Sequence, residues 1–261
     1  FLFSLGLLVT SCGGGSGGSD GGQVRVAVSP SSVNVIAGQT QQFTATVTGA
    51  LNSAIAWTVS CSTSSCGTIS SAGLYTAPAL IPSDTTVTVR ATSQEDTNIV
   101  GAATVTQSAV AVAVSPNSNL TLISADTRQF TATVDDAPTG HGTVTWSVSG
   151  GGTIDANGLY SAPAKVTADA TVTVTATSDF DNTKHTSATV TLKAPAVTLS
   201  PGDMTLEGGG QQQFAPTVSY VPAGQNGVTW TLDGLGTISA GLYNAPMLIG
   251  THQGAIIARL K

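Results

Sequence analysis

The chain has 261 residues, enough for one large domain or two to three small ones. It carries 8 Lys and Arg residues against 14 Asp and Glu residues, so its net charge of -6 opposes binding to a nucleic-acid backbone. Charged residues are only 8% of the chain, which excludes a long solvated coiled coil. The 40 Thr and 26 Val residues are β-branched, so the composition predicts an all-β protein.

The first residues indicate export. Residues 1–9 form an apolar run of the length found in secretory signals, shorter than the roughly 20 residues of a membrane span. Residues 9–12, Val-Thr-Ser-Cys, resemble the lipobox of bacterial lipoproteins. The resemblance implies a signal segment at residues 1–12, lipidation of Cys12 and anchoring at the bacterial cell envelope, at the outer membrane or cell surface. A non-lipidated signal with a chance cysteine, or a buried first strand, are the alternatives.

Residues 13–22 are expected to form a flexible tether, because they consist of Gly, Ser and one Asp. Such a segment has a mean reach of roughly 17 Å. Its glycines match the spacing of a dinucleotide fingerprint and of a nucleophile elbow. Both motifs require a strand before them and a helix after them, and neither context is present here.

Three copies of one pattern fill the rest of the chain, at residues 23–107, 109–193 and 195–261, called the first, second and third repeats below. A period of about 85 residues is that of a small domain, too long for a solenoid repeat. Each copy contains a Ser-Pro pair, a Gln-Phe run, a tryptophan and a Gly-Leu-Tyr segment followed by Ala-Pro. The recurring aromatic residues, expected to fill the cores, are Phe43, Phe130, Phe214, Trp57, Trp146 and Trp230.

Within each repeat, apolar and hydroxylated residues alternate with a period of two, as in Phe43, Ala45 and Val47 against Thr44 and Thr46. Turn-forming residues separate these runs. The pattern predicts two antiparallel sheets packed face to face in each repeat. About seven strands are expected in the first repeat, near residues 24–28, 33–36, 41–48, 53–60, 67–70, 85–92 and 99–106.

The run Gly38-Gln39-Thr40-Gln41-Gln42-Phe43, together with Trp57, Gly67-Thr68-Ile69 and Gly73-Leu74-Tyr75, resembles bacterial immunoglobulin-like domains of the group 2 type. These domains are related to modules of invasin and intimin stalks. The resemblance covers residues 24–261 and implies tandem immunoglobulin-like β-sandwiches. Such modules serve as spacers, adhesive tips or appendages of secreted enzymes, so the resemblance is more specific for fold than for function.

The polar residues of the sequence form no recognisable catalytic or metal-binding pattern. Cys61 and Cys66 are expected to form a disulfide, since the protein is expected to be exported. His141, His185 and His252 fall in non-equivalent positions and are interpreted as solvated loop residues. The acidic pairs do not follow the spacing of a calcium loop, although calcium between repeats remains an alternative. These pairs are Glu95 with Asp96, Asp135 with Asp136, and Asp179 with Asp181. No cofactor, metal site or enzymatic activity is predicted.

The third repeat lacks the run that forms the last expected strand of the other two, so an apolar groove is expected there. Truncation of a longer reading frame, or a strand donated by another chain, would each account for it. The joints between repeats are short, and three modules end to end would reach on the order of 80 to 100 Å.

The leading hypothesis is a lipid-anchored, non-catalytic stalk that acts as a spacer and interaction or adhesion module, with a protein or glycan ligand not identified by the sequence. One alternative is the N-terminal stalk of a larger secreted enzyme truncated at Lys261. The other is a fibre subunit assembled by strand donation. The oligomeric state is left open.

Overall fold

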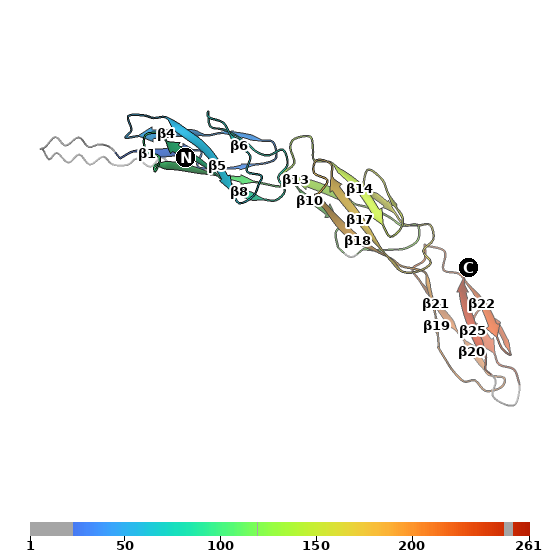
Figure 1. The fold of residues 1–261 in the computed structure, drawn as a ribbon. Helices are drawn as coiled ribbons and strands as arrows, with labels where there is room; N and C mark the ends of the chain where they lie inside the picture. Colours follow the sequence, from blue (N-terminus) through green and yellow to red (C-terminus); the bar gives the residue numbers. More distant parts are fainter. Residues whose placement is uncertain (1–22, 119, 248–252) are drawn as a thin grey trace, which may run out of the picture. The chain divides into compact units, whose positions relative to one another are not determined.

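The computed structural model describes residues 23–118, 120–247 and 253–261. The chain divides between Ser108 and Ala109 into two compact units, and the second unit holds the second and third repeats. Every regular element among the described residues is a β-strand (Figure 1). The prediction of tandem, all-β immunoglobulin-like sandwiches is confirmed.

The first two repeats have nine strands each, and seven strands are described in the third. The first repeat contains β1 (Arg25–Ser29), β2 (Ser32–Val35), β3 (Thr40–Gln42), β4 (Thr44–Thr48), β5 (Ile55–Cys61), β6 (Thr68–Ile69), β7 (Leu74–Thr76), β8 (Thr85–Ser93) and β9 (Val100–Gln107). The second contains β10 (Ala111–Ser115), β11 (Leu120–Leu122), β12 (Thr127–Gln129), β13 (Thr131–Asp135), β14 (Val144–Ser149), β15 (Thr153–Ile154), β16 (Leu159–Ser161), β17 (Ala170–Ser178) and β18 (His185–Leu192). The third contains β19 (Ala196–Ser200), β20 (Gln211–Gln213), β21 (Ala215–Ser219), β22 (Val228–Asp233), β23 (Thr237–Ser239), β24 (Leu242–Asn244) and β25 (Ala255–Leu260).

Each of the first two repeats is a two-layered sandwich. One layer is a four-stranded sheet, ordered β2-β9-β8-β5 in the first repeat and β11-β18-β17-β14 in the second. The other layer consists of the pair β1-β4 with the sheet β3-β7-β6, and of β10-β13 with β12-β16-β15. Strand β1 lies against β8 and β9, which closes the core between the layers.

The sequence prediction of the strands was wrong in three respects. The expected strand at residues 41–48 is interrupted at Phe43, so β3 and β4 belong to different sheets. Strand β7 was not predicted as a strand. The sheets are not wholly antiparallel either, because β2 pairs in parallel with β9. Alternation reports which face a residue takes, and it is the same for both strand directions, so it cannot reveal a parallel pair.

The core of each of the first two repeats is filled by valines and aromatic side chains. In the first repeat Val87, Val89 and Val105 from the large sheet are 0% exposed, as is Tyr75 from the small one. The equivalent residues of the second repeat are buried to the same degree. Burial of apolar surface on this scale is the main stabilising term of a sandwich.

A contact between phenylalanine and glycine, called the Phe–Gly contact below, recurs in all three repeats. In the second repeat the Phe130 amide donates to the carbonyl of Gly158 over 2.9 Å. Gly158 has a φ of 82°, and a Cβ built on it would lie 2.5 Å from the Phe130 carbonyl oxygen and 3.1 Å from the Trp146 indole. Only glycine permits this conformation and this approach without strain. The neighbouring Gln129 side chain donates to the carbonyls of Phe130 and Asn157, which holds the turn in place.

The Phe–Gly contact predicts that an added methyl group at Gly158 destabilises the second repeat strongly. Gly140 is a matched control, because its φ is 85° but a Cβ there would meet no atom within 4 Å. Both alanine substitutions carry the cost of a left-handed backbone, about 1–2 kcal/mol, and Gly158→Ala adds about 1–3 kcal/mol of overpacking. Hydrogen exchange of the full chain, measured at increasing urea concentrations, gives the free energy of unfolding of the second repeat in each of the two variants. Equal losses in the two variants would contradict the role of the contact.

Candidate functional site

The solvent face of the sheet formed by β14, β17 and β18 carries a concentration of hydroxyl groups. Strand alternation places Thr145 and Ser147 of β14 beside Thr175 and Thr177 of β17 on this face. Thr175 and Ser187 of β18 share a hydrogen bond of 2.8 Å between their hydroxyl oxygens. The same alternation turns the valines of these strands to the core, so each strand separates an apolar face from a hydroxylated one.

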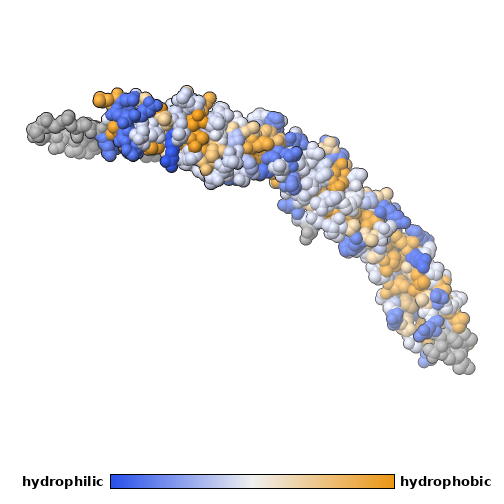
Figure 2. All heavy atoms as spheres, in the orientation of Figure 1, coloured by the Kyte–Doolittle hydropathy of each residue, from blue (hydrophilic) through white to orange (hydrophobic). Residues whose placement is uncertain are grey.

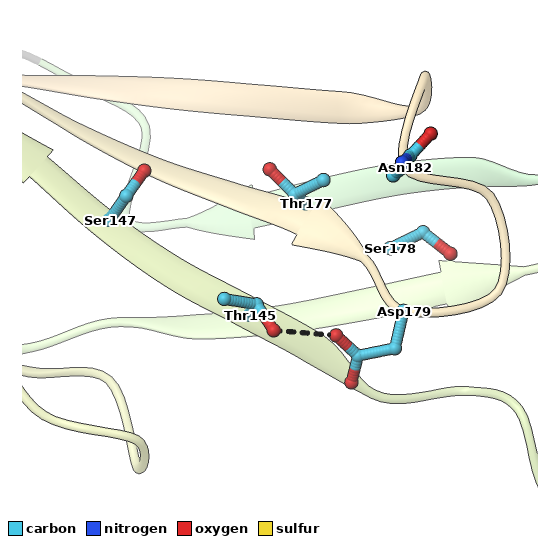
Figure 3. A pocket seen from close by; sticks show the side chains of 6 residues that line it. All are labelled: Thr145, Ser147, Thr177, Ser178, Asp179 and Asn182. Atoms are coloured by element: carbon cyan, nitrogen blue, oxygen red, sulfur yellow. Dashed lines mark hydrogen bonds between the residues drawn. The ribbon is translucent and has the colours of Figure 1, made fainter.

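A hollow of about 380 Å³ lies at one end of this hydroxylated face (Figure 3). Strand β14 supplies two of its side chains, β17 two more, and the loop after β17 the remaining two. The lining residues are Thr145, Ser147, Thr177, Ser178, Asp179 and Asn182. Five of these six side chains are neutral and polar, and Asp179 is the only charged one.

The Asp179 carboxylate is held in position by hydroxyl groups. Its Oδ1 accepts a hydrogen bond of 2.7 Å from the Thr145 hydroxyl (Figure 3), and its backbone amide donates to the Thr143 carbonyl over 3.1 Å. Hydrogen bonds from the Thr143 and Thr145 side chains to the carboxylate lower the pKa of Asp179 below its ordinary value of 3.8. Asp179 is therefore a fixed, ionised acceptor at neutral pH.

This arrangement suits binding better than acid–base catalysis. The nearest acidic neighbour in sequence, Asp181, is only 6% exposed. Its Oδ1 accepts hydrogen bonds from the Thr183 amide and the Thr183 hydroxyl, at 3.0 and 2.7 Å, so it holds the turn between β17 and β18. A glycosidase needs two carboxyl groups facing one bond, and here one of the pair is buried in a turn. The hollow instead offers hydroxyl donors and acceptors around one fixed negative charge.

The structure places the histidines in different surroundings. The ring of His141 lies 5.3 Å from that of Phe180, between centroids. The prediction of a loop position was wrong for His185, which begins β18 opposite Thr177 because the hairpin before it is shorter than expected. His252 lies outside the described residues. Among residues 23–118, 120–247 and 253–261, no three His, Cys, Asp or Glu side chains are grouped to hold a metal ion.

The other two acidic pairs act locally. Glu95 accepts a hydrogen bond from the Asn52 amide, and Asp96 accepts one of 2.9 Å from the Asn98 amide. These contacts stabilise the ends of loops in the first repeat. Asp135 ends β13, and Asp136 follows it with a φ of 57°, a value that Asp tolerates better than most residues.

The recurring aromatic residues differ in burial. Phe43, Phe130 and Phe214 are 1%, 0% and 6% exposed. Trp57 and Trp146 are only partly buried and pack against the margins of their cores. The ring of Trp146 lies 6.4 Å from that of Phe130, between centroids, and it lines a second surface hollow of about 330 Å³. Trp230 of the third repeat is also partly buried.

Sequence reasoning missed two of the most deeply buried side chains, Tyr75 and Tyr160, which are 0% exposed. The Tyr75 hydroxyl donates to the Cys66 carbonyl over 2.8 Å and accepts from the Gln107 side chain over 2.7 Å. Burial raises the pKa of Tyr75, whereas the hydrogen bond from Gln107 acts in the opposite direction. The recurrence of tyrosine in each Gly-Leu-Tyr segment was the available signal.

Cys61 and Cys66 form a disulfide, with their Cα atoms 5.6 Å apart. The bridge joins the end of β5 to the loop before β6, where the second repeat has three successive glycines, residues 150–152, with positive φ. Closing so short a loop restricts the unfolded chain and contributes about 2 kcal/mol. Cys12 lies outside the described residues.

The end of the second repeat is held by a charged pair. The Lys193 ammonium lies 2.6 Å from Asp169 Oδ2, and the Ala194 amide donates to Asp169 Oδ1 over 2.9 Å. The hydrogen bond from Lys193 lowers the pKa of Asp169, and the same bond raises that of Lys193. The side chains of Lys193 and Asp169 are 33% and 55% exposed, so solvent screens the pair, which orients the chain at the joint and adds little stability.

No helix long and apolar enough to cross a membrane is found in the part of the chain that the structure describes.

No protein-family model matches the chain, and no curated protein is similar enough to count as a relative. Among solved structures, the chain is similar to three N-terminal domains of the highly immunogenic outer capsid protein of bacteriophage RB49. The identity is 15%, 91% of each chain is covered and the TM-score is 0.38. It is also similar to human CDH23 EC21-23, with 12% identity over 90% of this chain and 99% of that one, and a TM-score of 0.32. The immunoglobulin domains 1–4 of Sidekick-1 match with 10% identity over 90% of this chain and 75% of that one, and a TM-score of 0.29.

The hydrogen bonds from hydroxyl groups to Asp179 predict that its carboxyl group titrates at a lowered pKa. Because the folded pKa lies below the unfolded one, the ionised group stabilises the fold above the unfolded pKa, and this stabilisation is lost as pH falls through the folded pKa. Carboxyl NMR of the full chain should give a midpoint below 3.8, and Thr143→Val or Thr145→Val should raise it. Thr175→Val, which removes a hydroxyl bonded to Ser187 instead, serves as the control. A midpoint that is unchanged in both test variants would refute the assignment.

Proposed function

We propose that the chain is a non-catalytic stalk of three tandem immunoglobulin-like modules, anchored by lipid outside a bacterial cell. It acts there as a spacer and as an adhesion or interaction module. The observation that carries the proposal is the filled interior of the sandwiches, whose valines and aromatic rings are packed to 0% exposure in the first two repeats. Both hollows described above lie at the surface of the second repeat, and neither brings two ionisable groups together.

The distribution of the recurring residues supports a scaffold. Four residue types recur at equivalent positions in all three repeats: Gln, Phe, Gly and Tyr. The Gln side chains and the Phe–Gly backbone pairs hold turns by hydrogen bonds, and the aromatic rings pack in or against the cores. Asp179, which has no acidic counterpart at the equivalent Gln94 of the first repeat, is exposed. Repetition therefore preserves the sandwich itself, which is what a spacer requires, and leaves the surface free for contacts with partners.

The surface also fits an extracellular module that stays soluble. Most of the face shown in Figure 2 is pale, with hydrophilic and hydrophobic residues interspersed. An ion pair joins Lys193 to Asp169 at the end of the second repeat. Contacts made through a surface of hydroxyl groups depend little on ionic strength, because salt does not screen hydrogen bonds between neutral groups.

The lipid anchor predicts a defined result for Cys12. Cys12→Ala should abolish the incorporation of labelled palmitate and release the protein from the membrane fraction, since the acyl chains supply the attachment. Ser11→Ala keeps the cysteine and a small residue before it, and is expected to retain the label. A membrane-bound, unlabelled wild-type chain would contradict the proposal.

The spacer role predicts that the second repeat can be exchanged for another module. In cells that display the chain, residues 109–193 are deleted or replaced by an unrelated β-sandwich of similar length. Binding of antibody-coated beads to an epitope tag at residue 261 should fall after the deletion and recover with the replacement. A glycan and matrix-protein binding screen of the same three chains tests adhesion. If the deletion abolishes binding to a glycan or matrix protein and the replacement does not restore it, the second repeat holds a specific ligand site.

A further inference from the structure

The hollow at Asp179 is built on a backbone contact that all three repeats share. In each repeat, the residue that follows β8, β17 or β25 donates its amide to the carbonyl of the residue that precedes β5, β14 or β22. The pairs are Gln94 with Ala54 at 2.9 Å, Asp179 with Thr143 at 3.1 Å, and Lys261 with Gly227 at 3.0 Å. Because the contact forms with six different residues, the fold does not depend on the side chains at these two positions.

The side chains around this contact differ between the first two repeats. Thr145 is the equivalent of Ala56, because each lies one residue before the tryptophan of its strand. Two hydroxyl groups and a carboxylate in the second repeat therefore take the places of two methyl groups and an amide in the first. The second repeat has Thr143, Thr145 and Asp179 where the first has Ala54, Ala56 and Gln94. The first repeat forms the same four-stranded sheet without them, so the sandwich does not require this polar set.

The Asp179 carboxylate retains capacity to bind a ligand. An ionised carboxylate has about four lone-pair sites for hydrogen bonds. The hydroxyl groups of Thr143 and Thr145 donate to it, which fixes its position and uses part of this capacity. The side chain is exposed, so the remaining lone pairs can accept hydrogen bonds from a molecule in the hollow.

Three further lining side chains are available for hydrogen bonds. They come from β14, from β17 and from the loop after β17, and none makes a side-chain hydrogen bond to another residue in the described part of the chain. They are Ser147, Thr177 and Asn182 (Figure 3). Each hydroxyl can donate and accept, and the amide offers two donors and one acceptor. A ligand with several neutral hydroxyl groups would complement this lining.

We propose that the hollow binds one neutral hexopyranose ring of a glycan. The Asp179 carboxylate accepts hydrogen bonds from two adjacent sugar hydroxyls, and bonds to an ionised acceptor are stronger than neutral ones. Ser147, Thr177 and Asn182 bond to the other hydroxyls of the ring. The volume of about 380 Å³ lies within the range of small-molecule sites, about 300–1,000 Å³. This inference rests on the interaction role proposed above and names the class of ligand.

Other classes of ligand fit the hollow less well. A calcium ion takes about six to eight oxygen ligands, several of them carboxylates, and Asp179 is the only carboxylate in the lining. The centre of a protein interface is apolar and aromatic, whereas all six lining side chains here are polar. Sugars that carry a carboxylate are repelled by Asp179 and by the net charge of -6. A neutral sugar avoids each of these conflicts.

The test is an NMR titration of the ¹⁵N-labelled full chain with the methyl glycosides of glucose, galactose and mannose. At least one should shift the amides of residues 143–147 and 177–182, with a Kd on the order of 1 mM, because few hydrogen bonds form at an open surface. Added salt should leave this Kd unchanged. The corresponding methyl uronide, with a carboxylate at C6, should bind at least about threefold more weakly.

A variant with three substitutions removes the site and keeps side chains that this fold accepts. Thr143→Ala, Thr145→Ala and Asp179→Gln together give the second repeat the residues of the first, and should weaken sugar binding at least about tenfold. Ser149→Ala is the matched control, because Ser149 lies on the same face of β14 but does not line the hollow. It should bind the sugar as the unmodified chain does.

The proposal would be overturned if none of the three glycosides shifted these amides at concentrations up to about 50 mM. Sugar binding that is equal in the triple variant and the unmodified chain would also overturn it. Tetra-arginine is the probe for a basic protein segment. Salt-sensitive shifts at the hollow with tetra-arginine, and none with the sugars, would assign the hollow to such a segment instead. The bead-binding result for the spacer role does not depend on any of these outcomes.

Discussion

Phe130 can lie against Gly158 only because the glycine has no Cβ and adopts a φ of 82°. This Phe–Gly contact joins the break between β12 and β13 to the turn before β16, and it places the glycine against the indole of Trp146. The next residues then carry Tyr160 into the centre of the core, where it is 0% exposed. The packing of the large sheet against the small one depends on this arrangement, which the other repeats reproduce with Phe43 and Phe214.

The alternation of side chains was sufficient to predict the fold class, the inward phenylalanines and most strands. It could not predict that Phe43 interrupts a strand, because the break comes from the hydrogen bond between its amide and the distant Gly73 carbonyl. Nor could it reveal the parallel pairing of β2 with β9, since partners far apart in sequence leave no mark on a period of two. The strand break and the parallel pair therefore depend on contacts between residues far apart in sequence, which the local pattern does not specify.

The candidate site was harder to predict than the fold. The carboxylate of Asp179 and its hydroxyl neighbours come from a loop and from β14, which lie more than thirty residues apart in sequence. Asp179 and Asp181 look alike in the sequence, yet one is an exposed acceptor and the other is buried in a turn. Their difference arises from the hairpin between β17 and β18. There the Asp181 amide donates to the Ser178 hydroxyl, and the Thr183 hydroxyl donates to the Asp181 carboxylate. The disulfide was predictable, because a pair of cysteines in a protein expected to be exported is expected to be oxidised.

The parallel pair of β2 and β9 also determines how each sandwich carries load. These strands lie near the two ends of the first repeat, and β11 and β18 do the same in the second. Tension between the ends of a repeat acts along this pair and shears it, so its hydrogen bonds bear the force together instead of opening one by one. The parallel pair thus acts as a mechanical clamp in each of the first two repeats.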